Sequence, residues 1–165
     1  MNRISMIKEQ IESVSTMTKK LVMSVDENDW KVTPEVIASN INWQVGHILL
    51  AKYFHAITCV LGRQLAVKEQ LPLKDYVEWY TMGSNPGAEM NSKPSKTKLM
   101  ADLSFIDAMA LDTLDKITEE DLLAPPEEKN PMAVTKYEAL MWSFKHQMWH
   151  NGQIAMIKRV LKRNL

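Results

Sequence analysis

Residues 135–154, TKYEALMWSFKHQMWHNGQI, decide the fold class that we expect of this chain. The stretch opens with Thr135 and Glu138, whose side chains can each cap the other's backbone amide at the start of a helix. At about 100° per residue, the apolar side chains then fall into two unlike sectors of one helix. One sector contains Tyr137, Leu140, Met141, Phe144, Met148 and Ala155, and the other contains Ala139, Ser143, His146, His150, Ile154 and Ile157. We therefore expect both sides of this helix to be buried.

Three further helical segments precede this one. Apolar residues spaced three and four apart between residues 4 and 25 are typical of one face of a long amphipathic helix. A second helix is expected over residues 40–61, with Ser39 or Asn40 as its N-cap. A third is predicted by the apolar stripe of residues 99–117. No segment shows the alternation of a strand, so the pattern predicts an all-α fold, a four-helix bundle.

The connection from Gly62 to Ser95 is the longest irregular stretch, and it would cross over between the second and third helices. Long connections in compact domains are often functional. Its aromatic residues Tyr76, Trp79 and Tyr80, within a short helical pattern, are our lid candidates over a binding pocket. The alternative is that they anchor the long connection to the core.

Composition narrows the class of protein. With 165 residues, 45% of them hydrophobic, residues 1–165 can bury one good core and are expected to form a single domain. The 20 basic and 20 acidic residues balance, which argues against a nucleic-acid-binding surface. One cysteine and no export signal favour a cytoplasmic protein. No apolar run is long enough for a membrane span, so we expect no membrane association.

Two histidines lie four residues apart in the last helix, His146 and His150. This spacing puts both rings on one helix face, where they can bind the same metal ion. A third histidine, His47, lies with Trp43 and Phe54 on the side of the second helix that we expect to face the core. The three together predict a metal site built from two helices.

Two other potential ligands lie nearby in the sequence. His55 is rotated by about 80° from His47 on an ideal helix and is expected at the edge of that face. Cys59 lies three turns beyond His47 and is interpreted as a buried small residue rather than a ligand. Any single histidine among apolar residues can also be a hydrogen-bonded core residue. Metal-free histidines in an interaction bundle therefore stay an alternative.

Two stretches resemble signatures of the DinB/YfiT-like superfamily. SNINWQVGH at residues 39–47 is similar to its second-helix signature, and HQMWHNGQI at residues 146–154 is similar to its last-helix signature. The resemblance implies an up-down-down-up bundle, usually a homodimer, in which His47, His146 and His150 hold one divalent metal ion, zinc or nickel. It also implies kinship with bacillithiol- and mycothiol-dependent transferases.

Three neutral imidazoles leave open positions on a divalent ion, which is typical of a catalytic metal site. The regular helix faces provide no carboxylate beside the histidines to act as a base, because Glu138 is expected to cap its helix. This favours activation of a small thiol for transfer to a small electrophile. Gln153 is a candidate partner of the ligands or contact for substrate. A metal-dependent hydrolase and a non-catalytic, stress-linked metal-binding protein are the alternatives.

Overall fold

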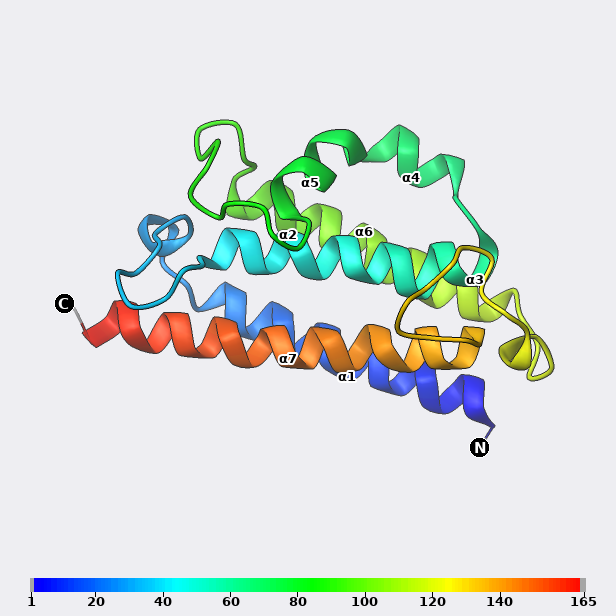
Figure 1. Cartoon of the computed structure of the whole chain (residues 1–165). Coiled ribbons are helices and arrows are strands. Elements are labelled where there is room, and N and C mark those ends of the chain that lie inside the picture. Colours follow the sequence, from blue (N-terminus) through cyan, green and yellow to red (C-terminus); the bar gives the residue numbers. More distant parts are fainter. Residues whose placement is uncertain (1, 164–165) are drawn as a thin grey trace.

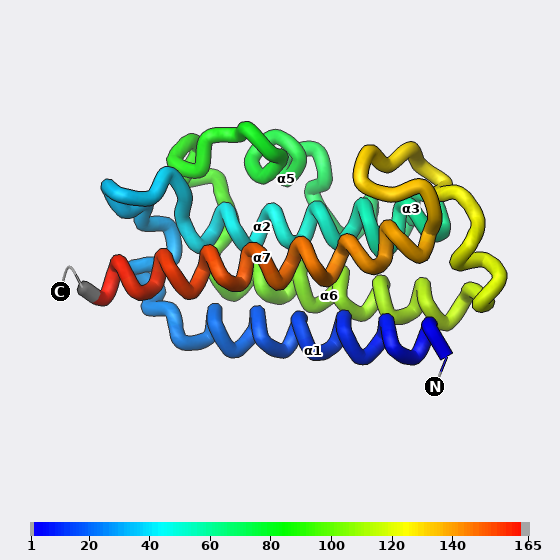
Figure 2. The backbone as a smooth tube through the Cα atoms, turned by 60° about the horizontal axis from the view of Figure 1, so that its bottom comes forward, coloured from blue at the N-terminus to red at the C-terminus, as the bar shows by residue number. Residues whose placement is uncertain are grey.

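Four long helices lie alongside one another in the computed structural model, which describes residues 2–163 (Figure 1). They are α1 (Arg3–Met23), α2 (Ile41–Lys52), α6 (Lys96–Asp115) and α7 (Lys136–Arg163). The described residues contain no strand, which confirms the prediction of an all-helical fold. Figures 1 and 2 show α1 and α7 running in one direction and α2 and α6 running in the other. No described helix is both long and apolar enough to cross a bilayer.

Each long helix begins at a side chain that accepts a hydrogen bond from its first turn. These side chains belong to Asn2, Asn40, Ser95 and Thr135. Glu138 accepts a second hydrogen bond from the backbone amide of Val134, at 2.7 Å. The predicted caps Asn40 and Thr135 are thus confirmed, and they satisfy amides that no helical carbonyl can reach. Glu138 differs from the prediction, because it accepts from the amide of Val134 and not from that of Thr135.

The apolar stripes of α1 and α6 form much of the core, as predicted. The fully buried residues of these two helices include Ile7, Ile11, Val14, Leu99, Leu103, Ile106, Ala110 and Leu114. Helix α1 packs against α6 and α7, and α2 packs against the same two helices from the other side. Every long helix therefore has two long neighbours.

Helix α7 is buried on two sides only in its first half. The sector with the histidines is buried throughout, but Met148 and Ala155 of the other sector are exposed, contrary to the prediction. The side of α7 that faces α1 is polar there. Gln147 donates to the hydroxyl of Thr18 at 2.7 Å, and that hydroxyl donates to Asn151 at 2.8 Å. Polar residues satisfied by a neighbouring helix leave no apolar signal in the sequence.

The second helix changes its winding halfway along. A π-helical segment, η2 (Tyr53–Thr58), follows α2, and a last turn, α3 (Cys59–Leu61), ends at Gly62 with φ 76°. The hydroxyl of Thr58 donates to the carbonyl of Tyr53 at 3.1 Å. A π turn takes more residues than an α turn, so residues beyond Lys52 are rotated relative to an ideal α-helix.

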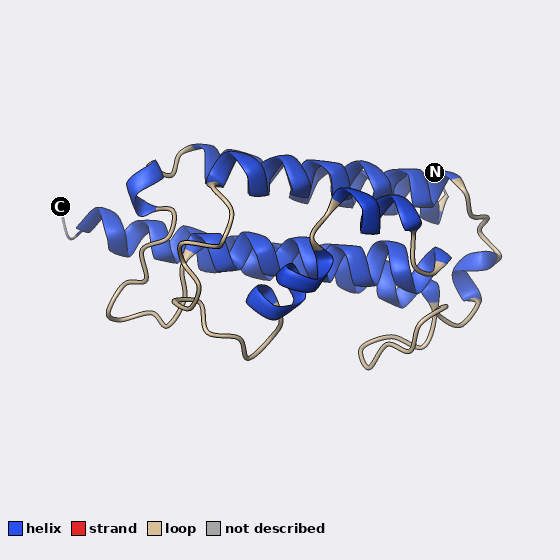
Figure 3. Cartoon of the chain, turned by 90° about the horizontal axis from the view of Figure 1, so that it is seen from above, coloured by secondary structure: helices blue, strands red, loops and turns tan. Residues whose placement is uncertain are grey.

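The crossover between the second and third long helices carries two short helices, α4 (Leu65–Gln70) and α5 (Leu73–Tyr80). Figure 3 shows this short helical pair beside the long helices, and α5 packs against α2. A Cβ atom added to Gly46 would lie only 2.4 Å from the ring of Tyr80, so α5 approaches α2 as closely as a glycine allows. Two 3-10 turns, η1 (Glu27–Asp29) and η3 (Asp121–Leu123), lie in the other connections.

Candidate metal centre

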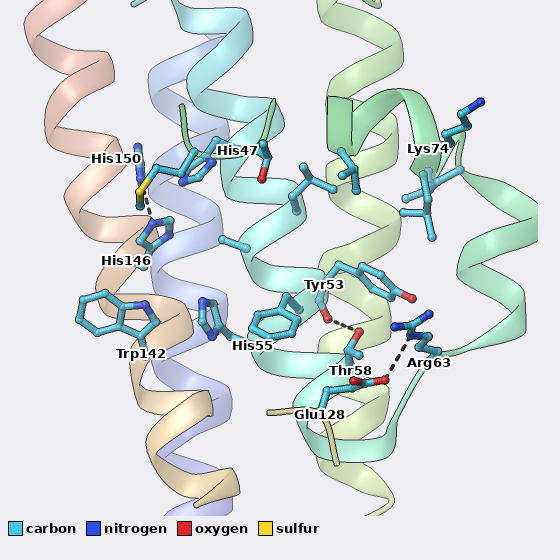
Figure 4. Close-up of a pocket in the computed structure, with 18 of the residues that line it drawn as sticks. His47, Tyr53, His55, Thr58, Arg63, Lys74, Glu128, Trp142, His146 and His150 are labelled. Carbon is cyan, nitrogen blue, oxygen red and sulfur yellow. Dashed lines mark hydrogen bonds and ion pairs between the residues drawn. The ribbon is translucent and has the colours of Figure 1, made fainter. Parts of the chain in front are cut away.

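His47 of α2 and His146 and His150 of α7 converge on one point (Figure 4). One potential ligand atom from each ring lies within 4.8 Å of those of the other two. The Nε2 atoms of His146 and His150 are 3.1 Å apart. The structure therefore brings together the three histidines that the sequence singled out, although they belong to helices about a hundred residues apart.

Two of the three rings are oriented by oxygen acceptors. The Nδ1 of His47 donates to the carbonyl of Tyr80 at 2.8 Å, and that of His150 donates to Oε1 of Gln44 at 2.5 Å. Gln44 in turn donates from Nε2 to the hydroxyl of Ser39 at 2.8 Å. A carbonyl oxygen can only accept, so each Nδ1 carries the proton and each Nε2 keeps a lone pair. This is the arrangement that metal-binding histidines adopt.

The three imidazoles are neutral at pH 7. Burial lowers the pKa of His47 below its ordinary value of 6.5, against the raising effect of its bond to Tyr80. Burial, together with the charge of the neighbouring rings, lowers the pKa of His146 to about 4 and that of His150 to about 3. Neutral imidazole is the form that binds a metal ion.

An open cleft of about 1590 Å³ adjoins the histidines. Residues of α2, η2, α4, α5 and α7 and of the loop around Met132 line it. The face of the second helix with Trp43, His47 and Phe54 lines this cleft, so the prediction that it faces the core is wrong. The core is contacted instead by the side with Val45 and Leu49, because α2 is apolar nearly all round and its sequence does not distinguish the two faces.

Charged residues of the cleft lie apart from the histidines. Figure 4 shows Arg63, Lys74 and Glu128 on the far side of the cleft from His150. Arg63 donates from Nε to Glu128 at 3.2 Å. The only other carboxylate in the cleft lining of the described residues is that of Asp75, on α5. Glu138 is engaged at its helix start, as expected.

The remaining site candidates divide between the cleft and the core. Gln153 lines the cleft, one turn beyond His150. Tyr76 and Tyr80 are buried, and their hydroxyls donate to Asp102 at 2.5 Å and to Asn42 at 2.9 Å. Trp79 is half-buried against the same core. The aromatic cluster holds α5 on the bundle, and its use as a lid stays a prediction.

His55 is not an edge residue, contrary to the prediction. It is only 8% exposed, it lines the cleft, and its ring centroid is 6.3 Å from that of His146. The π-helical winding of η2 explains the difference, because it turns residue 55 by less than an ideal α-helix would. Cys59 is fully buried and accepts a hydrogen bond from Asn130 at 3.4 Å, which agrees with its interpretation as a buried residue.

The fold and the histidine group together define an all-helical protein with a candidate metal centre beside a cleft. The sequence model of the DinB superfamily matches residues 10–154, and the chain belongs to this superfamily. Among solved structures, a conserved protein from Enterococcus faecalis has a similar fold, with a TM-score of 0.75 and 16% sequence identity. That match covers 97% of each chain. Among curated proteins, none matches the chain significantly.

Proposed function

We propose that the protein binds one divalent metal ion, zinc or nickel, through His47, His146 and His150, and that it activates a small thiol for transfer to an electrophile. The observation that carries the proposal is the convergence of three neutral imidazoles beside an open cleft. Membership of the DinB superfamily agrees with it. We infer the identity of the metal and the reaction from the chemistry of this site.

The donor set fits a first-row ion. Ligands about 2.05 Å from a tetrahedral zinc ion are about 3.3 Å from one another, and the Nε2 atoms of His146 and His150 are 3.1 Å apart. The Nδ1 of His146 is buried without a hydrogen-bond partner among the described residues. A buried polar atom of this kind costs stability, which agrees with a site retained for binding rather than for packing.

A divalent ion bound by three neutral imidazoles keeps its positive charge and stabilises a thiolate near neutral pH. The chain itself supplies the orientation of the ligands, through Gln44 and Tyr80, and the adjoining cleft has a largely apolar lining. Hydrolysis would call for a base beside the ion. The cleft lining has two carboxylates, of which Glu128 is paired with Arg63, and neither Glu128 nor Asp75 belongs to the group formed by the three histidines. This supports thiol transfer over hydrolysis.

Metal content tests the binding step. Purified protein loaded with zinc or nickel and then dialysed should retain about one ion per chain by elemental analysis, and His150→Ala should lower the affinity at least about tenfold. Met156→Ala is the matched control, because Met156 lies on the same helix with its side chain 55% exposed. Wild-type protein that retains neither metal would contradict the proposal.

Turnover tests the reaction. The metal-loaded protein should accelerate attack of a small thiol on 1-chloro-2,4-dinitrobenzene, in which a carbon–sulfur bond forms, chloride leaves and the thiol proton goes to buffer. Removal of either the metal or the thiol should abolish the acceleration. Metal-dependent ester hydrolysis without a thiol would identify a hydrolase instead, and tight metal binding without any turnover would identify a metal-binding protein.

We also propose that residues 1–165 form a single domain, and that α1, α2, α6 and α7 are an up-down-down-up four-helix bundle with its crossover at residues 62–95. The helix directions in Figures 1 and 2 and the packing of each long helix against two others support this topology. A homodimer is proposed with it, and sedimentation of the purified chain would measure its mass in solution.

A further inference from the structure

Asn130 orients a fourth histidine of the cleft. Its Oδ1 accepts a hydrogen bond from the backbone amide of Met132 at 2.8 Å, which places its Nδ2 on the opposite side. The Nδ2 lies 2.8 Å from the Nδ1 of His55 and 3.4 Å from the sulfur of Cys59. Because the Met132 amide can only donate, the orientation of the Asn130 side chain is determined by its surroundings.

This orientation determines the tautomer of His55. An amide NH₂ group only donates, so the Nδ1 of His55 has to accept and its proton has to lie on Nε2. The arrangement is the reverse of that at His47 and His150, whose Nδ1 atoms donate to oxygens. Two of the converging histidines thus present a lone pair from Nε2, whereas His55 presents an N–H.

The Nε2 of His55 has no hydrogen-bond partner among the described residues, and the ring lines the cleft. Its centroid lies 6.3 Å from that of His146 (Figure 4). The π-helical segment η2 places it there. A donor in this position can reach an atom of a ligand whose other end is held at the three histidines, if the ligand is a few bonds long.

We propose that His55 donates a hydrogen bond from Nε2 to a carboxylate or carbonyl oxygen of the ligand bound at the three-histidine centre, and that Asn130 fixes the tautomer which makes this possible. Binding of this ligand rests on the proposed metal site, whereas the tautomer of His55 does not. This hydrogen bond would give the cleft a preference for thiols that carry an acceptor oxygen close to the sulfur.

The tautomer can be measured on metal-free protein. Long-range proton–nitrogen NMR spectra of ¹⁵N-histidine-labelled wild type should show His55 protonated on Nε2. In Asn130→Asp both side-chain oxygens accept, so the Nδ1 of His55 should become protonated. A wild-type spectrum with the proton on Nδ1 would overturn the proposal, whatever the metal content of the protein.

The ligand preference can be measured on zinc-loaded protein by calorimetry. The probes are 3-mercaptopropionate and 1-propanethiol, which differ in the acceptor group. His55→Phe should reduce the preference for 3-mercaptopropionate by about 10-fold to 100-fold, the worth of one hydrogen bond to a charged group, without changing the affinity for zinc.

Asn130→Asp should reduce the same preference while keeping the imidazole, and His55→Gln, which retains a side-chain N–H, should keep part of it. An unchanged preference in both His55→Phe and Asn130→Asp would contradict the proposal. Failure of the wild type to bind zinc would instead refute the metal site, and the NMR result would still decide the tautomer.

Discussion

Gln44 is the side chain on which the orientation of His150 depends. Its Oε1 accepts a hydrogen bond from the Nδ1 of His150, with 2.5 Å between the two atoms, and its Nε2 donates one to the hydroxyl of Ser39. Replacement by leucine removes the acceptor, so Gln44→Leu should lower zinc affinity by about 10-fold to 100-fold. Gln44→Glu retains an acceptor oxygen and should bind zinc nearly as tightly as wild type.

Competition with a chromophoric chelator measures these affinities. Gln70→Leu, at an exposed position outside the cleft lining, is the control for the loss of an amide. Equal zinc affinities for wild type and Gln44→Leu would show that the hydrogen bond does not orient His150 for binding.

The lowered pKa values of the buried histidines predict how the stability of the metal-free protein depends on pH. His150 has a pKa of about 3 in the folded chain against 6.5 as its ordinary value. Between these values the unfolded chain binds the proton and the folded chain does not. The free energy of unfolding should therefore be fully retained above about pH 6.5 and fall as the pH is lowered towards 4, by up to about 1.4 kcal/mol per pH unit for each such group.

Urea titrations at a series of pH values would show this slope. His150→Gln has no proton to gain at this position and should give a shallower slope over the same range. A slope as steep as that of wild type would mean that other groups account for the acid sensitivity.

At the scale of single residues, the sequence predicts which histidines come together better than it predicts what surrounds them. His146 and His150 could be recognised by their spacing, and His47 by the face that it shares with Trp43. Gln44 could not, because its partner is 106 residues away and no local pattern pairs them. His55 was placed wrongly because an ideal helix was assumed where the chain forms a π turn.

At the scale of helices, the contact between α5 and α2 depends on Gly46. A methyl group there would lie 2.4 Å from the ring of Tyr80, whose carbonyl holds His47. Gly46→Ala should therefore destabilise the protein by about 1–3 kcal/mol, the usual cost of overpacking, and should weaken zinc binding through the displaced carbonyl.

Thermal and urea unfolding measure the first effect, and chelator competition measures the second. Gly152→Ala on α7 is the matched control, because an added methyl group meets nothing within 4 Å there. It should stabilise the helix by about 0.5–1 kcal/mol. A Gly46→Ala variant as stable as wild type would show that α5 can move away from α2 with little loss of stability.

Helix existence and helix starts could be predicted, since caps and apolar stripes are local signals. Asn40 and Thr135 cap as expected. Which face of α2 meets the core could not be predicted, because apolar residues cover both of its sides. The exposure of Met148 could not be predicted for a related reason. The buried side of α7 is occupied there by Gln147 and Asn151, which contact Thr18 through hydrogen bonds, and a pattern of apolar residues does not indicate such contacts.

At the scale of the whole molecule, a buried ion pair joins three helices. Lys52 of α2 is 1% exposed and lies 2.5 Å from Asp107 of α6 and 2.7 Å from the hydroxyl of Ser15 of α1. Asp107→Ala leaves the ammonium group buried without its partner and should destabilise the fold by about 3–5 kcal/mol. The double variant Lys52→Met with Asp107→Leu should lose far less.

Urea unfolding would measure both variants. Asp112→Ala removes a partner from an exposed ion pair with Lys116 and should cost less than about 1 kcal/mol. If Asp107→Ala and Asp112→Ala proved equally mild, the buried pair would contribute no more than a surface pair.

The class of fold and the family could be predicted from the sequence because both follow from the overall helical pattern and two short stretches. The buried pair could not, since a lysine inside an apolar helix looks like a surface residue until its partner on another helix is known. The same applies to the size of the cleft, which depends on where α4, α5 and the loop around Met132 lie relative to the long helices.

The cleft is lined by only some of the helices of the molecule. None of the residues that line it comes from α1 or α6, which serve only as a frame. The segments that wall the cleft, residues 63–82 and 128–132, contain both buried and exposed side chains. Val67, Tyr76 and Tyr80 are buried in the core, whereas Leu65, Val77 and Met82 are exposed. Substitutions at the exposed wall positions can therefore reshape what the protein accepts, while the buried side chains and the histidines beside them stay as they are.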